Sequence, residues 1–239
     1  MPKRDKLPVQ AVVMAGGLGM RMRPLTEHTP KPLLEVNGRP ILSYVLERLN
    51  TCGVRDVTIS LNYLGEQIES RFGDGRSDGL DIRYCREEKP LGTFGALSLI
   101  GRPTEEALLV MNSDLLTNLD FGEFHRRFVE SGADFAIGCM TYPVHVPYGV
   151  FDTDGDGRIR GVHEKPTYTY LANGGIYLLK SALLGMIPPD QRFDATDFIN
   201  LAVEKKLHIL AYPLHCYWRD IGKMEDFAVA QEEVKSIQF

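Results

Sequence analysis

Short apolar runs alternate with amphipathic segments along the first half of the chain. The apolar runs have the length and composition of buried strands, which we expect over residues 9–15, 54–62, 81–87 and 106–114. The segments between them place apolar residues at three- and four-residue spacing, and each segment has a glycine near its C-terminal end. This spacing predicts helices over residues 39–53, 64–73 and 92–101. The alternation is typical of a parallel α/β sheet.

The second half of the chain has a different hydrophobic pattern, with several predicted strands in succession. After a helix-like segment at 121–132, strand-like runs with turn signals follow one another at residues 133–142, 148–165 and 171–180. We therefore expect part of this half to be antiparallel. Further helices are predicted over 194–206 and 223–237, on either side of a strand-like run at 207–218. With no low-complexity linker and no internal repeat, one mixed α/β domain over residues 1–239 is the economical interpretation.

Composition narrows the class of protein. The chain has 239 residues and a formal net charge of −5, which argues against a general nucleic-acid binder. Its four cysteines are scattered with no C-x-x-C pair, which favours thiols in a reducing compartment, the cytoplasm, over disulfides or a zinc site. No apolar stretch approaches the length of a membrane span, so we expect no membrane association.

The first predicted strand runs into a glycine-rich, basic segment, "AVVMAGGLGMRMRPLTEHTPKPLL" (11–34). Glycines allow a backbone to approach a ligand and turn its N–H groups toward phosphate oxygens, and Arg21 and Lys31 can neutralise a polyphosphate. A plain glycine turn with surface cations stays an alternative. The segment is not a Walker loop, since no Gly-Lys-Ser/Thr follows. It is not a dinucleotide fingerprint either, because Met22 stands at the third glycine position.

Two carboxylates follow predicted strands. Asp114 comes directly after the run at 106–114, and Asp220 follows the run at 207–218. In open α/β sheets, ligands bind at the carboxyl ends of the strands, so both side chains could face one crevice. Two carboxylates beside a phosphate site would hold Mg²⁺. For Asp114 alone, a helix cap or turn residue is the alternative interpretation.

The ordered motifs resemble the sugar-1-phosphate nucleotidyltransferases, also called nucleotide-sugar pyrophosphorylases. The resemblance spans nearly the whole chain: "MAGGLGMRMRPLTEHTPKPLL", "EEKPLGTFGALSLI", "VMNSDLLTN", "YGVF", "VHEKP", "NGGIYLL" and "WRDIG". It is most similar to the glucosamine-1-phosphate and mannose-1-phosphate guanylyltransferases. The resemblance implies a Rossmann-like three-layer nucleotidyltransferase fold, with a mixed, mostly parallel sheet and helices on both faces. Residues of about 8–115 would bind the nucleotide, and residues of about 116–239 would form the sugar-binding, antiparallel part.

The resemblance also assigns roles. Arg21 would bind the leaving phosphates, Lys31 would bridge the α-phosphate and the attacking sugar phosphate, and Asp114 and Asp220 would hold Mg²⁺. The expected nucleotide-binding residues are Ala15, Gly16, Gly17, Gly19, Glu87, Pro90, Gly92 and Thr93. The expected sugar-phosphate-binding residues are Gly149, Glu164, Lys165 and Asn173. The implied partners are a nucleoside triphosphate and a sugar 1-phosphate, and whether the chain forms a homo-oligomer stays open.

The resemblance places Glu87, with Glu88 beside it, in the segment that lines the nucleobase pocket. An ionised carboxylate only accepts hydrogen bonds, and guanine offers two adjacent donors. This predicts GTP as the donor, with a uridylyl- or thymidylyltransferase as the alternative. The other interpretation is that both glutamates are solvated charges at the end of a strand.

Two residues depart from the family pattern: Met20 replaces the usual threonine, and Ser113 the usual glycine before the metal-binding aspartate. They leave open a non-catalytic protein that senses nucleotide sugars. A nicotinamide dehydrogenase is disfavoured by the missing third glycine.

The segment 152–163 starts like an EF-hand calcium loop, but His163 replaces the bidentate glutamate and the flanks predict strands, so a hairpin is expected.

Overall fold

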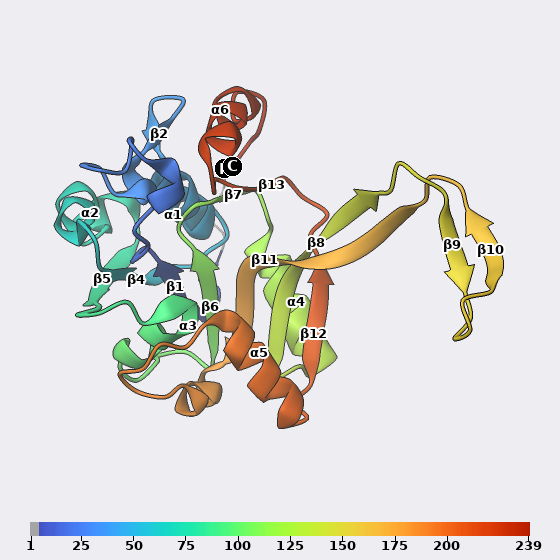
Figure 1. Ribbon diagram of the computed structural model, residues 1–239. Coiled ribbons are helices and arrows are strands. Elements are labelled where there is room, and N and C mark those ends of the chain that lie inside the picture. The colour runs from blue at the N-terminus through green and yellow to red at the C-terminus, as the bar shows by residue number, and fades with distance from the viewer. Residues whose placement is uncertain (1–4) are drawn as a thin grey trace.

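A seven-stranded sheet forms the centre of the molecule in the computed structural model, which describes residues 5–239 (Figure 1). Its strand order is β12-β8-β11-β6-β1-β4-β5. Its strands are β1 (Val9–Met14), β4 (Asp56–Leu61), β5 (Asp81–Arg86), β6 (Ala107–Asn112), β8 (Phe135–His145), β11 (Thr167–Lys180) and β12 (Ile209–Pro213). Only β11 runs antiparallel to its neighbours. The expected mixed, mostly parallel sheet is confirmed.

The remaining elements are short. The other strands are β2 (Glu35–Val36), β3 (Arg39–Pro40), β7 (Leu115–Thr117), β9 (Val150–Thr153), β10 (Ile159–His163) and β13 (Trp218–Asp220). The α-helices are α1 (Ile41–Thr51), α2 (Gly65–Phe72), α3 (Gly92–Gly95), α4 (Phe121–Ser131), α5 (Ala195–Glu204) and α6 (Met224–Glu233). The 3₁₀ helices are η1 (Met20–Met22), η2 (Lys31–Leu33), η3 (Arg76–Asp78), η4 (Ala96–Leu99) and η5 (Ser181–Met186).

Alternating side chains of the central strands enter two separate cores. Val9, Ala11 and Val13 of β1 belong to a cluster with buried residues of α1, α2 and α4. Val12 belongs to a second cluster, on the opposite face, with residues of α3, η4 and α5. Period-two alternation in a strand thus matches helices on both faces of the sheet, the three-layer arrangement that was expected.

The segment 92–101 departs from its predicted helix. It forms the four-residue helix α3 and then the 3₁₀ helix η4. The N–H groups of Phe94 and Gly95 donate to the carbonyl oxygen of Phe193, at 3.0 and 2.8 Å, instead of entering a longer helix. Two glycines in four residues also lower helix propensity. The apolar spacing read from the sequence buries Phe94 and Leu97 in the second core all the same.

A third apolar cluster lies under α6. It joins Met22, just after the glycine-rich loop, to Ile221, just after β13, and to Ala230 on α6 itself. Because Met22 and Ile221 pack in the same cluster, it positions the glycine-rich loop and the end of β13 relative to each other.

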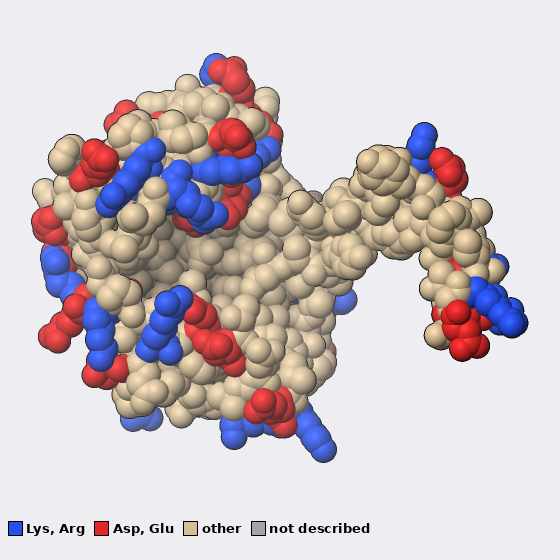
Figure 2. Space-filling model, in the orientation of Figure 1, with Lys and Arg blue, Asp and Glu red and all other residues tan. Residues whose placement is uncertain are grey.

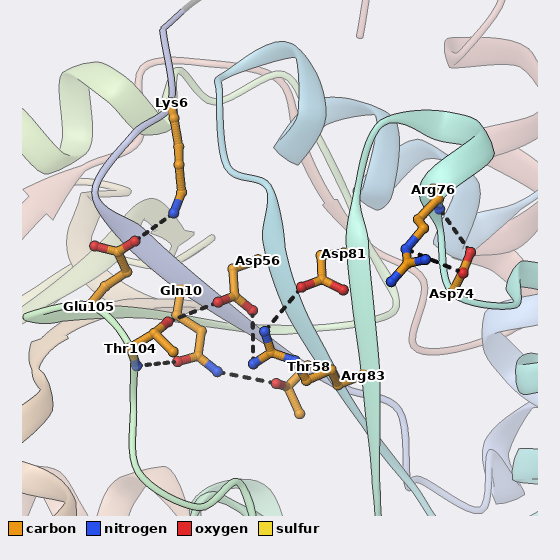
Figure 3. A network of polar contacts seen from close by, with 10 residues as sticks. All are labelled: Lys6, Gln10, Asp56, Thr58, Asp74, Arg76, Asp81, Arg83, Thr104 and Glu105. Atoms are coloured by element: carbon orange, nitrogen blue, oxygen red, sulfur yellow. Dashed lines mark hydrogen bonds and ion pairs between the residues drawn. The ribbon is translucent and has the colours of Figure 1, made fainter.

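Polar side chains tie the amino-terminal ends of the parallel strands together (Figure 3). Gln10 of β1 donates to Thr58 of β4 at 3.2 Å and accepts from the backbone N–H of Thr104 at 3.2 Å. Thr104 in turn donates to Asp56 at 2.8 Å, and Arg83 of β5 lies 3.5 Å from the other oxygen of Asp56. This network stabilises the end of the sheet opposite to the carboxyl ends of the strands.

Beyond the body of the molecule, β8 and β11 continue outward as a two-stranded ribbon that ends in the hairpin β9–β10 (Figures 1 and 2). We call residues 141–171 the arm. The expected hairpin over 152–163 is confirmed: the Asp154 carboxylate accepts from the backbone N–H groups of Asp156 and Arg158, which closes its turn. Across residues 5–239, none of the helices has both the length and the apolar character needed to cross a bilayer.

Candidate active site

A cavity of about 380 Å³ opens at the carboxyl ends of β1 and β6. It lies at the edge of the sheet where ligands bind in α/β folds. It brings together every predicted nucleotide-binding residue, both predicted catalytic cations and the first predicted metal ligand: Ala15, Gly16, Gly17, Gly19, Arg21, Lys31, Glu87, Pro90, Gly92, Thr93 and Asp114. Figure 2 shows a hollow in this face of the body, with Lys and Arg side chains gathered along its upper rim.

The loop after β1 needs glycine at two places. Gly19 has a φ of 61°, in the left-handed region, and a Cβ there would stand 2.9 Å from Cγ2 of Thr26. The hydroxyl of Thr26 donates to the Gly19 carbonyl at 2.8 Å and holds the turn. At Gly16, a Cβ would stand 2.5 Å from Oε1 of Glu87, so that the backbone passes directly beside this carboxylate. The loop therefore lies close to the cavity without side chains filling it.

Lys31 and Asp114 form an ion pair inside the cavity. Lys31 lies in η2 and is 9% exposed. Asp114 lies in the two-residue turn between β6 and β7, and its backbone carbonyl accepts from the N–H of Ile221 at 3.1 Å. A cation that is nearly buried, with its charged end at a carboxylate, is fixed in direction and not free to follow solvent.

Asp220 lies beside Asp114 although the two are far apart in the sequence. It ends β13, which pairs antiparallel with β7, and it stands opposite Leu115 in that ladder. Burial raises the pKa of Asp220, and the negative charge of Asp114 raises it further. Two like charges in one half-buried site are a feature of sites built for a cation.

Arg21 approaches the same carboxylate from the glycine-rich side. A Cβ built on Gly222 would stand 3.4 Å from Oδ2 of Asp220 and 3.5 Å from a guanidinium nitrogen of Arg21. Lys31 and Arg21 both act against the upward shift in the pKa of Asp220. Arg21, Lys31 and Asp114 thus line one end of the cavity, and Asp220 lies beside them without lining it.

Glu87 is at the other end of the cavity. Its Oε2 accepts from the backbone N–H of Leu91 at 2.9 Å, and its pKa is raised by burial. Glu88, the neighbouring candidate, is exposed and does not line the cavity. The geometry therefore favours Glu87 as the carboxylate that a bound base would meet.

Asp194 lines the cavity and was not expected there. It is the N-cap of α5 and forms a capping box with Asp197. Its Oδ1 also accepts from the backbone N–H of Thr93 at 3.0 Å, and the Thr93 hydroxyl accepts from the N–H of Ala195 at 2.8 Å. The sequence D-A-T-D before an amphipathic helix signals a cap, but it does not say that the cap faces a cavity.

The expected sugar-phosphate-binding residues do not line this cavity. Gly149, Glu164 and Lys165 lie on the arm, where a Cβ on Gly149 would stand 3.3 Å from the Glu164 carboxylate. Asn173 lies where β11 leaves the body. Its side chain accepts from the N–H of Gly175 at 2.9 Å and donates to the Tyr177 hydroxyl at 2.8 Å, across an irregularity in the β8–β11 register. The roles of these four residues stay predictions.

A family model described as nucleotidyl transferase matches residues 10–237. The chain belongs to this family. The matched region includes all of the central sheet except Val9, its first residue, and all the residues that line the cavity.

Similar proteins of this family act on several sugars and bases. The chain is 33% identical to mannose-1-phosphate guanylyltransferase of Mycobacterium tuberculosis, over 92% of this chain and 62% of that protein. It is 30% identical to UTP–glucose-1-phosphate uridylyltransferase of Synechocystis, over 96% of this chain and 66% of that protein. It is 31% identical to D-glycero-alpha-D-manno-heptose 1-phosphate guanylyltransferase of Aneurinibacillus thermoaerophilus, over 95% of this chain and 99% of that protein.

The chain therefore spans less than two thirds of the first two of these relatives and nearly all of the third. Among solved structures, HddC from Yersinia pseudotuberculosis has a TM-score of 0.74 and is 28% identical, over 94% of this chain and 99% of that one. The Rossmann-like nucleotidyltransferase fold that the motifs implied is confirmed.

Nucleotidyl transferases of this family generally use a divalent metal ion. The carboxylates present fit such an ion. Oδ1 of Asp114 is buried and has no hydrogen-bond partner among the described residues, so one oxygen is left for a cation. Residues 5–239 contain no cluster of three or more His, Cys, Asp or Glu side chains arranged for a metal. A pair of carboxylates completed by substrate phosphates is the arrangement that Mg²⁺ prefers.

Behind the site, Glu233 of α6 holds the strand that carries Asp220. Its carboxylate accepts from Nε and a terminal nitrogen of Arg219, at 2.5 and 2.6 Å, and from the Tyr217 hydroxyl at 2.8 Å. Glu233→Gln is expected to lower the free energy of unfolding by about 1–2 kcal/mol, because a charge-assisted bidentate contact is lost. That loss corresponds to a fall in Tm of about 3–6 °C.

The matched control is Glu232→Gln on the same helix, whose partner Lys235 is exposed, and its Tm should stay near that of the native chain. Hydrogen bonding to Arg219 holds the pKa of Glu233 below 4.5, so this contribution is present above pH 4.5 and lost as the pH falls through the lower folded value. Thermal melts that show equal Tm values for the two variants at neutral pH would exclude Glu233 as the clamp.

Proposed function

We propose that the protein transfers a nucleoside monophosphate from a nucleoside triphosphate, preferably GTP, to a sugar 1-phosphate, with release of pyrophosphate. The observation that carries the proposal is that Lys31 and Asp114 pair in the cavity beside the glycine-rich loop, and that the charge of Asp220, just outside the cavity lining, interacts with both. Relatives named as sugar-1-phosphate guanylyltransferases support the choice of substrates.

The triphosphate would lie along the glycine-rich loop. Backbone N–H groups of a loop with little side-chain bulk can donate to phosphate oxygens, and Arg21 is exposed at the same rim. A guanidinium binds two oxygens at once and stays charged at any working pH, which suits the β- and γ-phosphates that leave.

In the chemical step, an oxygen of the sugar phosphate forms a bond to the α-phosphorus of GTP. The bond from the α-phosphorus to the oxygen that bridges to the β-phosphate breaks, and that electron pair leaves on pyrophosphate. The nucleophile is already an anion, so no strong base is needed. The barrier comes mainly from bringing two anions together in line. Lys31 would neutralise charge at the α-phosphate, and its near-burial would strengthen that interaction.

Asp114 and Asp220 would hold Mg²⁺, which when bound would offset the negative charge of the phosphates. The ion also accounts for two neighbouring carboxylates at a half-buried position. Without a cation, burial and the charge of Asp114 disfavour ionisation of Asp220.

Glu87 would select the base. An ionised carboxylate can accept from N1–H and the 2-amino group of guanine together. Uracil and thymine have one ring N–H flanked by carbonyl oxygens, which the carboxylate repels. Adenine lacks both of the guanine donors and would leave Glu87 unpaired, at a cost of about 1–3 kcal/mol.

Glu87→Gln is therefore expected to lower the ratio of kcat/KM for GTP over UTP by about tenfold or more, because the amide presents only one acceptor group. The measurement is that ratio, taken on one enzyme preparation with one sugar 1-phosphate. Glu88→Gln is the matched control and should leave the ratio unchanged. A native enzyme that uses UTP or dTTP better than GTP would overturn the choice of base and leave nucleotidyl transfer standing.

The same ratio should depend on pH. Burial raises the pKa of Glu87 above 4.5 in the folded protein. On acidification, Glu87 therefore becomes protonated at a higher pH than a solvent-exposed glutamate. The protonated group no longer accepts both guanine donors, and the preference for GTP should fall on acidification in the native enzyme but not in Glu87→Gln. A ratio removes the effect of Asp220, whose pKa is also raised but which acts on both nucleotides alike.

The substrates are identified by a matrix of GTP, UTP, dTTP, ATP and CTP against glucosamine, mannose, glucose and heptose 1-phosphates, with pyrophosphate release as the readout. We expect the highest rate with GTP and a hexosamine or related hexose 1-phosphate. Binding of nucleotide sugars without turnover in any combination would instead support the non-catalytic sensor that Met20 and Ser113 left open.

A further inference from the structure

The arm is the largest feature of the fold that does not line the cavity. Nine of the 17 large apolar side chains that are exposed within residues 5–239 belong to its 31 residues. Figure 2 shows that its two strands lack charged side chains, which appear only at the bend and at the end of the hairpin. Apolar surface concentrated in this way marks an interaction site.

The apolar side chains of the arm are ordered by the strand register. Tyr142 pairs with Tyr170, and Val144 pairs with Tyr168. Directly paired residues of an antiparallel ladder lie on the same face of the sheet, so these four side chains form one apolar face. All four are exposed, Tyr170 at 57%. Strands with one apolar face are normally half-buried against a second layer.

The arm also leaves the edge of β11 open. β6 pairs with β11 only from Ile176 onward, and β12 pairs with β8 only up to Cys139, so no described strand lies on either side of the arm. The β8 edge is blunted by Pro143, which has no N–H to donate. The β11 edge, Thr167–Leu171, contains neither proline nor charge. Natural proteins block exposed edges of this kind unless a further strand pairs there.

The open edge is complementary to a second copy of itself. An antiparallel pairing about a two-fold axis at Thr169 sets Tyr168 of one copy opposite Tyr170 of the partner subunit, and the reverse. Every pair then joins residues of the same face: Tyr168 with Tyr170, Thr169 with its own copy, and Thr167 with Leu171. Such cross-strand pairs are favourable, and no like charges oppose one another.

We propose that two copies of this chain associate through the arm, by antiparallel pairing of their β11 edges about Thr169. We choose a second copy as the partner because the neutral edge of β11 can pair with an identical edge when a two-fold axis relates the two chains. The continuous strands β8 and β11, of 11 and 14 residues, carry this edge from the central sheet away from the chain's own body (Figure 1). The proposal does not depend on the proposed catalytic function.

The test replaces Thr169, which is exposed, by a charged residue of either sign. The native chain should sediment with twice the 26.8 kDa mass of one copy. Thr169→Lys and Thr169→Glu should each sediment as monomers, because two like charges would meet at the axis. An equimolar mixture of the two variants should recover the doubled mass, which shows at once that both are folded. Thr141→Lys, on the blunted β8 edge, is the matched control and should remain dimeric.

A native chain that stays monomeric at high micromolar concentration contradicts the proposal, whatever other protein then binds the arm. A dimer that survives both Thr169→Lys and Thr169→Glu contradicts it too, since the contact would lie elsewhere. Two monomeric variants that do not associate when mixed would likewise exclude pairing at this residue.

Discussion

Replacing Lys31 by alanine should lower kcat by about 10²–10³-fold with little change in the KM for GTP, the size of effect seen when one preorganised donor to a developing charge is removed. The cation is nearly buried and paired with Asp114, and in the proposed function it would act where charge on the α-phosphate grows during the reaction. Arg21→Ala should instead raise the KM as well, because the triphosphate it contacts is already present in the ground state.

The control for Lys31 is Lys6→Ala. Lys6 also pairs with a carboxylate, that of Glu105 at 2.7 Å, but at the amino-terminal end of the sheet (Figure 3). Its kinetic constants should match those of the native enzyme. Steady-state kinetics at saturating Mg²⁺ separate the two parameters. A Lys31→Ala enzyme with unchanged kcat and only a raised KM would show that Lys31 binds substrate without acting in the transition state.

Asp114→Asn and Asp220→Asn should each lower turnover at limiting Mg²⁺ by about 10²-fold or more, with partial recovery at high Mg²⁺. Each would remove the charge of a proposed metal ligand while keeping the volume of the side chain. Loss of charge neutralisation by a metal ion is worth several kcal/mol, and each 1.36 kcal/mol is a tenfold change in rate. A variant with native turnover at limiting Mg²⁺ would remove that residue from the set of ligands.

Thermal melts distinguish this loss from a loss of folding. The pKa of Asp220 is raised in the folded protein, so its ionised form costs stability as the pH rises above the unfolded value. Without metal at neutral pH, Asp220→Asn should melt at or above the temperature of the native chain. Mg²⁺ should then raise the Tm of the native chain more than that of the variant. Asp226→Asn, which changes a more distant charge that also raises the pKa of Asp220, is the matched control.

The sequence was sufficient for the parts of the site that follow strands directly. Asp114 and Asp220 each end an apolar run, and their proximity was expected because the carboxyl ends of strands meet at one edge of a sheet. Asp220 in fact ends β13, which pairs with β7 outside the central sheet. The same reasoning placed the glycine-rich loop at this edge. What the sequence could not give was the ladder between β7 and β13 that joins them, because both strands have only three residues.

The remaining differences arise from non-local contacts. Asp194 carries the signal of an N-cap whether or not that cap faces a cavity, and only the contact with Thr93 distinguishes the two. The position of Glu164 and Lys165 depends on the path of the part of β11 that precedes the irregularity near Asn173, which no local pattern specifies. The alternating T-Y-T-Y of residues 167–170 indicates a strand with one apolar face but not what covers that face.

The most direct test of nucleotidyl transfer follows the phosphorus atoms of GTP. With GTP labelled in its α-phosphate and a sugar 1-phosphate that the enzyme accepts, all the transferred label should appear in a sugar nucleotide. With label in the γ-phosphate, it should appear only in pyrophosphate, and neither product should form without the sugar phosphate. Label from the γ-phosphate in inorganic phosphate or on the sugar, or from the α-phosphate in free GMP, would contradict attack at the α-phosphorus and with it the function proposed for this cavity.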